Sequence, residues 1–452
     1  MNRPSTAELR AWDHQYLWHP FTQMRDWLAH EPLVIERGEG NYLIDTEGRR
    51  YLDGVSSLWC NVHGHRKAEL DAALKAQCDQ IAHSTMLGLA NVPATVLAKR
   101  LVELAPASLT RVFYSDAGAT AVEIALKLAL QYWQLRGEPQ RTRFVALTDA
   151  YHGDTLGAVS VGYSDVFHRF FRPAIRPALR TAPPHIFRWQ QRQPPDRALA
   201  SALAAAEAVF AMHGGEIAAL IVEPLMQGAA GMWAQPLDFL PVLRELTRRH
   251  GALLICDEVA TGFGRTGRMF AVDHEGVEPD ILCLGKGITG GYLPLAATLA
   301  SEAIFEAFLA PYERFEAFFH GHTYTGNPLA CAVALANLDV FEREGVVARV
   351  RARAEQLAAL LRELAASVPH VGDVRQWGLM AGIELVSDVS RRAPFAPALQ
   401  VGQRVTRAAR ERGIILRPLG NVIILMPPLS VTPDELDALV RAMAESIRAV
   451  TG

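Results

Sequence analysis

The chain has 452 residues, of which 50% are hydrophobic and 21% are charged, and its formal net charge is −3. This length is sufficient for a large core, divided between one large and one smaller domain. The weak negative charge excludes the basic surface that nucleic-acid binding or electrostatic membrane anchoring would need. The N-terminus lacks an apolar signal core, and we find no run of roughly 18 apolar residues that would span a membrane.

The five cysteines show no paired spacing; they are Cys60, Cys78, Cys256, Cys283 and Cys331. Two of them, Cys256 and Cys283, lie inside apolar segments that are typical of buried strands. Unpaired cysteines indicate a reducing compartment, so we expect the protein in the cytoplasm.

Strand-like and helix-like segments alternate through the middle of the chain. In chain order, the predicted elements are a strand at 111–114, a helix at 121–133, strands at 144–147 and 218–223, a helix at 237–249, and strands at 253–256 and 281–284. This alternation predicts an α/β fold with a mainly parallel sheet covered by helices. Ligands of such sheets bind at the carboxyl ends of the strands.

The pattern changes near residue 337, which predicts three parts. Residues 1–62 form an N-terminal segment that packs with the small domain, residues 63–336 form the large domain, and residues 337–452 form the small α+β domain. The small domain contains predicted helices at 346–366 and 433–450 and strands at 382–385 and 422–426. Within the large domain, residues 181–196 predict a surface loop, and 197–212 predict an alanine-rich helix.

Two reactive side chains follow neighbouring predicted strands. Lys286 follows strand 281–284 in a glycine-rich turn, and Asp257 closes strand 253–256. A lysine amine can form a Schiff base with the aldehyde of pyridoxal 5'-phosphate, while a carboxylate keeps the pyridine nitrogen protonated. A buried carboxylate needs a partner of this kind, because burying an unpaired charge costs several kcal/mol. Glu223 ends another strand and is a further candidate beside them.

Two nearby turns suit the rest of such a cofactor. The turn 115–120 joins a strand to a helix, and its backbone N–H groups could cradle a phosphate. Thr120 with Glu123 fits a capping box at that helix start. Tyr151 follows the next strand and could lie on an aromatic ring. In isolation, the first turn is equally well explained as an ordinary capped helix. The second is better explained as a loop tyrosine near a capping residue, Asp154. Beside Lys286, however, the cofactor interpretation of both turns is favoured.

Two apparent motifs are discounted. His320 and His322 are spaced like a metal pair, but no third ligand follows at a useful spacing, so we expect no metal. Gly285 and Lys286 resemble a phosphate-binding P-loop only superficially, because Asp280 stands where the first glycine of that motif should be. We therefore exclude an ATPase.

Two arginines have open interpretations. Arg417 precedes a strand of the small domain and suits the two-point capture of a carboxylate, or it is an ordinary surface arginine. Arg265 lies in the glycine-rich segment 261–267, which indicates a shaped loop rather than a plain turn.

Segments 257–267 and 285–287 resemble the class III aminotransferases, which have pyridoxal-phosphate fold type I with a mainly parallel, seven-stranded sheet. Segments 18–24, 53–57, 151–155, 326–331 and 417–420 resemble, more narrowly, the 7,8-diaminopelargonate synthases of biotin biosynthesis. The resemblance extends from about Leu17 to the C-terminus. It implies amino transfer to 8-amino-7-oxononanoate in two half-reactions of ping-pong type, with pyridoxamine phosphate between them.

The resemblance also implies residue roles. Lys286, Asp257 and Tyr151 would serve catalysis, with Lys286 as Schiff-base lysine and proton carrier. The implied cofactor-binding residues are Gly118, Ala119, Tyr151, Glu223, Asp257, Lys286, His322 and Thr323. The implied substrate-binding residues are Phe21, Leu58, Trp59, Tyr151, Asp154, Arg265, Lys286, Gly321 and Arg417. Arg417 would hold the acceptor's carboxylate, and His322 and Thr323 would reach the phosphate of a second subunit, which implies a homodimer.

The chain departs from the S-adenosylmethionine-using enzymes at three positions. Those enzymes usually carry Tyr, Trp and Pro where this chain has Phe21, Leu58 and His322. Segments 61–67, 81–85 and 319–326 instead resemble the branch that uses lysine, so the donor is open between S-adenosylmethionine and lysine. Two other functions also remain open: a general omega-aminotransferase acting on a diamine or beta-amino acid, and a non-catalytic cofactor-binding protein.

Overall fold

The computed structural model describes residues 3–185, 187 and 194–452. Its largest sheet has seven strands in the order β4–β12–β11–β10–β7–β5–β6. Their bounds are β4 Leu109–Ser115, β5 Arg143–Leu147, β6 Leu179–Thr181, β7 Ile217–Val222, β10 Leu253–Asp257, β11 Ile281–Leu284 and β12 Ala296–Ser301. All pairings are parallel except the two made by β12, so the predicted mainly parallel α/β sheet is confirmed.

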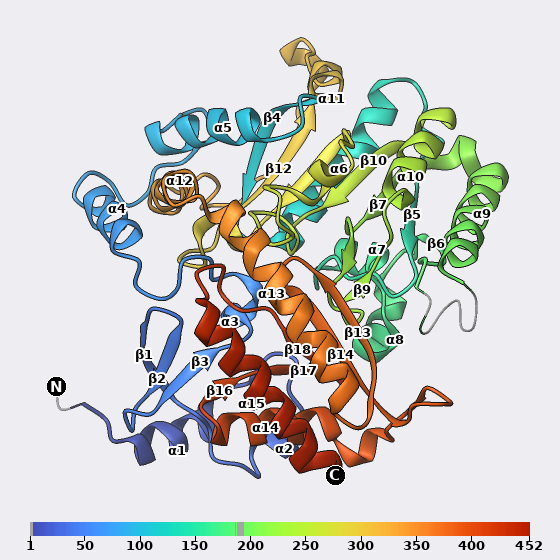
Figure 1. Ribbon diagram of the computed structural model, residues 1–452. Helices are drawn as coiled ribbons and strands as arrows, with labels where there is room; N and C mark the ends of the chain where they lie inside the picture. Colours follow the sequence, from blue (N-terminus) through green and yellow to red (C-terminus); the bar gives the residue numbers. More distant parts are fainter. Residues whose placement is uncertain (1–2, 186, 188–193) are drawn as a thin grey trace.

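Helices cover both faces of this sheet (Figure 1). On one face lies α6 (Gly118–Leu135), which buries Ala121, Ile124, Ala125 and Leu128 against the strands. These residues recur at helical spacing and form one apolar stripe. On the other face lie α9 (Pro195–His213) and α10 (Phe239–Arg249). The sheet is therefore buried on both sides, as parallel sheets usually are.

By length and composition alone, the segment Pro195–Glu216 could cross a membrane, which the sequence analysis did not expect. Its helix α9 packs against α10 and β6 and buries Ala198, Ala202, Ala206 and Phe210. A single helix of this kind is weak evidence for a membrane span, because core helices of other proteins pass the same test.

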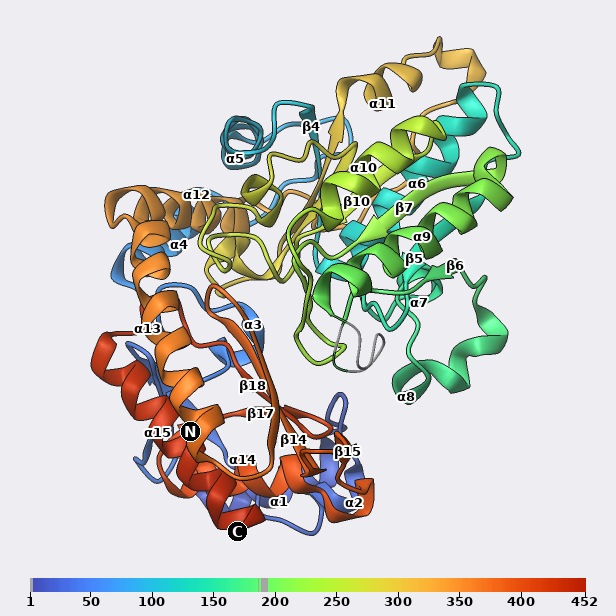
Figure 2. The same cartoon turned by 45° about the vertical axis from the view of Figure 1, so that its right-hand side comes forward.

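The two ends of the chain share the second part of the molecule, drawn in blue and in orange to red in Figure 2. Strands β1 (Ile35–Glu39), β2 (Tyr42–Asp45) and β3 (Arg50–Asp53) continue into β16 (Ile414–Ile415), which pairs with β3 in parallel. A second sheet contains β13 Val371–Trp377, β14 Met380–Asp388, β15 Ala393–Pro394, β17 Arg417–Leu419 and β18 Val422–Leu425. Helices α13 (Val346–Ser367), α14 (Val401–Glu411) and α15 (Pro433–Thr451) complete this part.

The remaining elements connect these parts. They are α1 Thr6–Tyr16, α2 Met24–Trp27, α3 Ser56–Trp59, α4 Ala68–Cys78, α5 Val92–Leu104, α7 Leu156–Val161, α8 Asp165–His168, β8 Met226–Gln227, β9 Trp233–Ala234, α11 Glu302–Ala307 and α12 Pro328–Arg343. Helix α12 packs on α4 and α5. The predicted domain boundary at residue 336 falls inside α12, and the division into three parts stays a prediction.

Two local predictions need comment. The loop predicted at 181–196 lies partly outside the described residues; Thr181 ends β6, and Pro195 begins α9. The capping box predicted for Thr120 and Glu123 is wrong, because α6 begins three residues before the predicted start, at Gly118, and its N-cap residue is Ala117. Thr120 bonds back to Ala117, and the Glu123 carboxylate instead accepts the Gly157 N–H at 2.7 Å.

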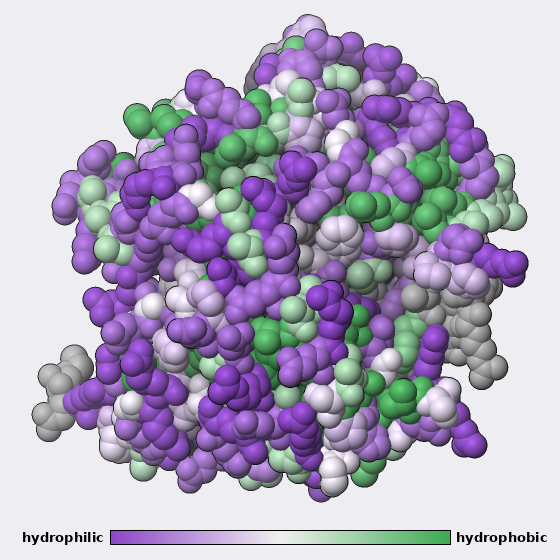
Figure 3. Space-filling model, viewed as in Figure 1, coloured by the Kyte–Doolittle hydropathy of each residue, from purple (hydrophilic) through white to green (hydrophobic). Residues whose placement is uncertain are grey.

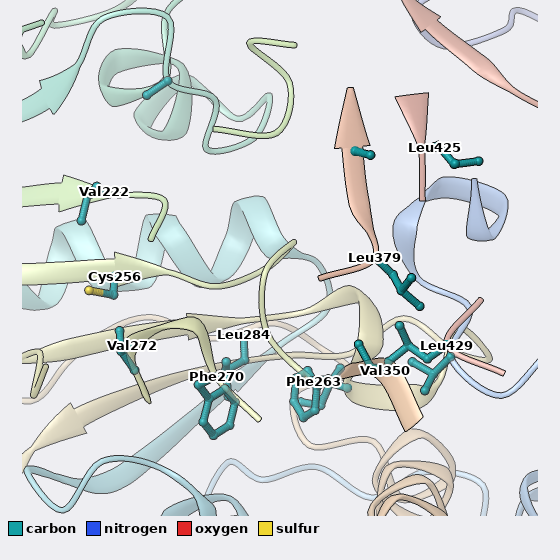
Figure 4. Close-up of a cluster of buried hydrophobic side chains, with 14 of the residues drawn as sticks. Val222, Cys256, Phe263, Phe270, Val272, Leu284, Val350, Leu379, Leu425 and Leu429 are labelled. Carbon is teal, nitrogen blue, oxygen red and sulfur yellow. The ribbon is translucent and has the colours of Figure 1, made fainter. Parts of the chain in front are cut away.

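The core extends along the sheet and into the second part. Figure 4 shows Val222, Cys256 and Leu284, the buried side chains near the ends of β7, β10 and β11, in one cluster with Leu379, Leu425 and Leu429 of the second part. Because this cluster is continuous, the strand ends and the second part are held in a fixed relation. The outer face seen in Figure 3 is mainly hydrophilic, with small separate hydrophobic groups.

Candidate active site

Three strand ends of the large sheet open into one cavity of about 520 Å³. Glu223 follows β7, Asp257 ends β10 and Lys286 follows β11, and all three line this cavity. The strands are adjacent and parallel, so their carboxyl ends lie at one edge of the sheet. The volume is within the usual range for a small-molecule site, about 300–1,000 Å³.

The adjacent carboxylates Asp257 and Glu258 point to opposite sides of the sheet, because successive side chains alternate. Asp257 lines the cavity and accepts a hydrogen bond from His152 Nδ1, 2.7 Å from its Oδ2. Glu258 turns away and accepts the N–H groups of Ala271 and Val272 at 2.6 and 2.9 Å. Burial raises the pKa of Glu258 to about 8. Only Asp257 of this pair can meet a ligand in the cavity.

His152 is a site residue that the sequence analysis missed. It is buried at the cavity wall next to Tyr151, and its Nε2 has no hydrogen-bond partner among the described residues. The sequence placed the loop 151–155 at a strand end but offered no sign that the imidazole, rather than the phenol alone, faces inward. The available signal was its position: it follows β5, which is separated only by β7 from the strand that ends in Asp257.

Lys286 occupies an unusual backbone position with a φ of 41°, directly after Gly285. Its Nζ lies 5.3 Å from the centroid of the Trp59 ring, within cation–π range. Burial lowers the pKa of the Lys286 ammonium, against the opposing attraction of Asp257 and Glu223. The amine is therefore biased toward the neutral form that can act as a nucleophile or a base.

Glu223 is held at the back of the cavity by two backbone amides. It accepts the Gly228 N–H at 2.9 Å and the Tyr151 N–H at 3.2 Å. Burial, reinforced by the nearby charge of Asp257 and opposed by His152 and the two amides, raises its pKa to about 7. This carboxyl can therefore change its protonation state near neutral pH.

The N-terminus of α6 borders the cavity through Ala117, Gly118 and Ala119. The first-turn N–H groups of this 18-residue helix lack partners within the helix, and with the helix dipole they favour an anion. The turn has no room for larger residues: a Cβ on Gly118 would lie 2.5 Å from Val259 Cγ1, and one on Gly153 would lie 2.3 Å from Ala119 Cβ. Such a close cradle fits a phosphate group.

Tyr151 and its neighbours form the outer part of the site. Its hydroxyl donates to Asp154 at 2.7 Å, and both residues line the cavity. Phe21 is half-exposed, and its ring meets the Tyr151 ring edge-on at 6.5 Å between centroids. Arg417, the first residue of β17, is close enough for its charge to lower the pKa of the Tyr151 phenol against the larger effect of burial. Neither Phe21 nor Arg417 lines the cavity itself.

Leu58 and Trp59 line the cavity from the short helix α3. Ser56, Ser57 and Trp59 have φ values of 51°, 59° and 64°, a conformation that costs non-glycine residues about 1–3 kcal/mol each. Leu58 is half-exposed, whereas Trp59 is buried. Trp59 Nε1 also lacks a hydrogen-bond partner among the described residues.

Arg265 does not line the cavity, and the contact with substrate expected for it stays a prediction. Its buried guanidinium donates to Ser56 Oγ at 3.2 Å, to Asn61 O at 3.3 Å and to Pro427 O. Burial lowers the pKa of Arg265 to about 9. Its donors are thus occupied behind the wall that carries Leu58 and Trp59.

The loop 320–326 is also outside this cavity in the single chain. His322 Nδ1 lies 2.6 Å from Asp116 Oδ2, next to the α6 turn, while Gly321 and Thr323 are exposed. The structure therefore brings together Lys286, Asp257, Glu223, Tyr151, Asp154, Leu58, Trp59, Gly118 and Ala119. It does not place Arg265, Gly321, His322 or Thr323 in the same cavity.

Comparisons with known proteins agree with this architecture. The class-III aminotransferase family model matches residues 24–447, so the chain belongs to the class-III aminotransferases. An adenosylmethionine-8-amino-7-oxononanoate aminotransferase of Nitratidesulfovibrio vulgaris is 54% identical over 448 residues, covering 99% of this chain and 82% of the relative.

Two solved structures are similar over almost the whole chain. The crystal structure of adenosylmethionine-8-amino-7-oxononanoate aminotransferase from Methanocaldococcus jannaschii has a TM-score of 0.94 and 45% identity, covering 98% of this chain and 99% of that one. A PLP-bound amine transaminase from an uncultivated Pseudomonas species has a TM-score of 0.92 and 42% identity, covering 97% and 99%. The first supports the narrower resemblance found in the sequence.

Proposed function

We propose that this protein is a pyridoxal 5'-phosphate-dependent aminotransferase that converts 8-amino-7-oxononanoate to 7,8-diaminononanoate in biotin biosynthesis. The observation that carries the proposal is the meeting of Lys286 and Asp257 with the α6 N-terminus in one cavity. The 54% identity to an enzyme named for that acceptor supports the choice of substrate.

The residues present fit this cofactor. The close glycine turn at α6 would hold the phosphate, Asp257 would face the pyridine nitrogen, and Lys286 would bind the aldehyde carbon. When bound, pyridoxal phosphate supplies an electron-withdrawing ring that stabilises the negative charge left by loss of a proton from an amine carbon. His152 would hold Asp257 through the 2.7 Å hydrogen bond, which keeps the carboxylate oriented.

The chain's own groups would then move protons and exclude water from the site. Lys286, biased toward the neutral amine, would take a proton from the donor carbon and deliver it to the former aldehyde carbon of the cofactor. Tyr151 and Trp59 would cover the reacting atoms and exclude water. Arg417 would capture the carboxylate of the acceptor at the outer end of the site.

The amino donor is S-adenosylmethionine or lysine. Phe21 lacks the hydroxyl, and Leu58 the indole, that the S-adenosylmethionine-using enzymes usually carry, so the donor side offers apolar surface and fewer hydrogen bonds. Mixing the holoenzyme separately with each donor and following the cofactor's visible absorbance would identify it. Bleaching by one donor at least about tenfold faster than by the other, a difference of 1.4 kcal/mol, would assign it.

The test of the function is direct. Purified protein, cofactor, each donor and 8-amino-7-oxononanoate are incubated together, and 7,8-diaminononanoate is measured by mass spectrometry. Product formation is the expected result. The 42% identity to an amine transaminase favours one alternative, a general omega-aminotransferase. Turnover of diamines or beta-amino acids with no conversion of the oxononanoate would replace our proposal by that alternative.

We further propose a cytoplasmic homodimer whose two sites share residues. Gly321 and Thr323 are exposed and outside their own chain's cavity, which suits a role in a partner's site. Large hydrophobic side chains nearby, including Leu87 and Phe319, are 81% and 73% exposed and would be buried by such a partner. All five cysteines are free, as expected in a reducing compartment. Sedimentation of a monomer at micromolar concentration would contradict the dimer.

A further inference from the structure

The helix α3 turn, Ser56–Trp59, is bent in a way that its own residues do not favour. Three of its four residues, Ser56, Ser57 and Trp59, have positive φ although none is glycine, and Ser57 has a ψ of −76°. Conformations of this kind persist only where the surroundings hold them in place, and they concentrate at functional sites.

Asp53 holds the turn from one side. Its carboxylate is fully buried at the end of β3, where it accepts the Val55 N–H at 3.2 Å and the Ser57 N–H at 2.7 Å. The Ser57 hydroxyl donates to the same carboxylate at 3.2 Å. Three donors on one buried carboxylate give strong, charge-assisted hydrogen bonds.

His65 and Asn61 continue the network. The Asn61 amide Nδ2 lies 3.1 Å from His65 Nδ1 and can only donate there, so the ring proton of a neutral His65 resides on Nε2. That Nε2 lies 3.2 Å from Asp53 Oδ2 and donates to it. Asn61 Oδ1 accepts the Gly64 N–H at 2.8 Å, which fixes the amide's orientation.

Arg265 closes the ring from behind. Its Nη2 donates both to Asn61 O at 3.3 Å and to Ser56 Oγ at 3.2 Å. The Ser56 hydroxyl in turn donates to Met426 O at 2.7 Å, beyond the end of β18. The turn is thus bonded on all sides by Asp53, His65, Asn61 and Arg265, which we call the α3 clamp.

The α3 clamp presents Leu58 and Trp59 to the cavity. The Trp59 ring lies 5.3 Å from Lys286 Nζ, and the space behind the ring is limited, because a Cβ on Gly228 would lie 3.1 Å from its Cζ3. We propose that the α3 clamp is a positioning device that holds the strained turn so that Leu58 and Trp59 set which amines can approach Lys286. The part of this inference that concerns amines rests on the proposed function. The part that concerns how the turn is held does not.

The first experiment removes the central acceptor. Asp53→Asn keeps the side chain's size but turns one acceptor into a donor that opposes the Ser57 and His65 protons. Asp45→Asn is the matched control: Asp45 is buried in the same sheet and accepts the Glu47 and Arg49 N–H groups at 3.0 and 2.9 Å, but its hydrogen-bond donors come from residues 47–51 and not from the α3 turn. Hydrogen exchange of the peptide covering residues 55–61 and kcat/KM for the two candidate donor amines, S-adenosylmethionine and lysine, are measured for both variants.

We expect Asp53→Asn to speed exchange of these amides at least about tenfold and to change the ratio of kcat/KM between the two amines at least about threefold, mainly through KM. Asp45→Asn should leave both within about twofold. Faster exchange with an unchanged amine ratio would reduce the clamp to a structural role and overturn the proposal, as would equal effects of both variants. If Asp53→Asn does not fold, Ser57→Ala, which removes one bond to Asp53, takes its place with the same two criteria.

Rescue supplies the second test. Glycine adopts positive φ without strain, so Ser57→Gly placed in the Asp53→Asn background should return the amine ratio to within about twofold of wild type. No return would contradict the role of strain. Hydrogen exchange of the apoprotein does not depend on catalysis. A protein that transfers no amino group would therefore refute the proposed function but not the α3 clamp. Hydrogen exchange, together with the cofactor's binding geometry measured by induced circular dichroism, would still test the clamp.

Discussion

The two walls of the cavity are built in different ways. On one wall, Glu223, Asp257 and Lys286 stand at the ends of adjacent buried strands, where the ladder of backbone hydrogen bonds sets their spacing. On the other wall, Leu58 and Trp59 come from a strained turn, and Arg417, outside the cavity itself, stands on a three-residue strand close enough to affect Tyr151. The comparison indicates that charged chemistry resides on the rigid sheet, whereas substrate shape and capture reside on segments from the two ends of the chain.

The largest effect is expected from a substitution in the wall formed by the strand ends. Lys286→Ala should lower kcat about 10⁴-fold or more, because it removes both the covalent attachment and the proton carrier. Transfer is measured by product formation, and borohydride treatment with peptide mapping should label Lys286 in the wild type only. A wild type labelled at another lysine would contradict the assignment of the cavity.

Asp257→Asn tests the same wall at a second point and should lower kcat about 10²–10³-fold, the usual effect of losing one preorganised electrostatic group. The variant keeps its size, so binding of the cofactor should persist and can be followed by absorbance. Glu258→Gln serves as its neighbour control, since Glu258 faces the opposite side of the sheet. Equal loss of kcat in both variants would show that folding, rather than Asp257, is responsible.

Arg417→Met tests the other wall and should raise KM for the carboxylate acceptor about 10–100-fold, since charge-assisted hydrogen bonds contribute about 1.5–3 kcal/mol. Turnover of an amine that lacks a carboxylate should change little. The methyl ester of the acceptor sharpens the test, because wild type and variant should bind it equally. A drop in kcat with unchanged KM would place Arg417 in the chemistry of the first wall instead.

The smallest expected effect concerns the pH dependence of stability. The folded-state pKa of Glu223 is raised to about 7, so its contribution to stability is present below about pH 4.5 and is lost as the pH rises through 7. In the apoprotein, Glu223→Gln should remove this loss, about 2–3 kcal/mol between pH 5 and 8. Urea unfolding of the wild type and of Glu223→Gln at pH 5 and 8 measures this change in the free energy of unfolding. The same pH dependence in both proteins would refute the prediction.

Much of the sheet could be predicted, because β5, β7, β10 and β11 are apolar runs closed by polar residues. Strand β12 was not predicted: its sequence, Ala296–Ser301, has few β-branched residues, and only its place between β4 and β11 makes it a strand. Helices α4, α5 and α12 were also missed. Their pairing with each other, rather than a strong local pattern, gives each its buried face.

By itself, the sequence determined where Lys286 and Asp257 stand: both residues lie at the ends of apolar strands, and strand ends of one parallel sheet share an edge. Only the tertiary structure decided the partners of those groups. It assigned His152 to Asp257, turned Glu258 away and withdrew Arg265 from the cavity to hold the α3 turn. Such contacts join residues far apart in the chain, and their side-chain directions depend on packing that no local pattern encodes.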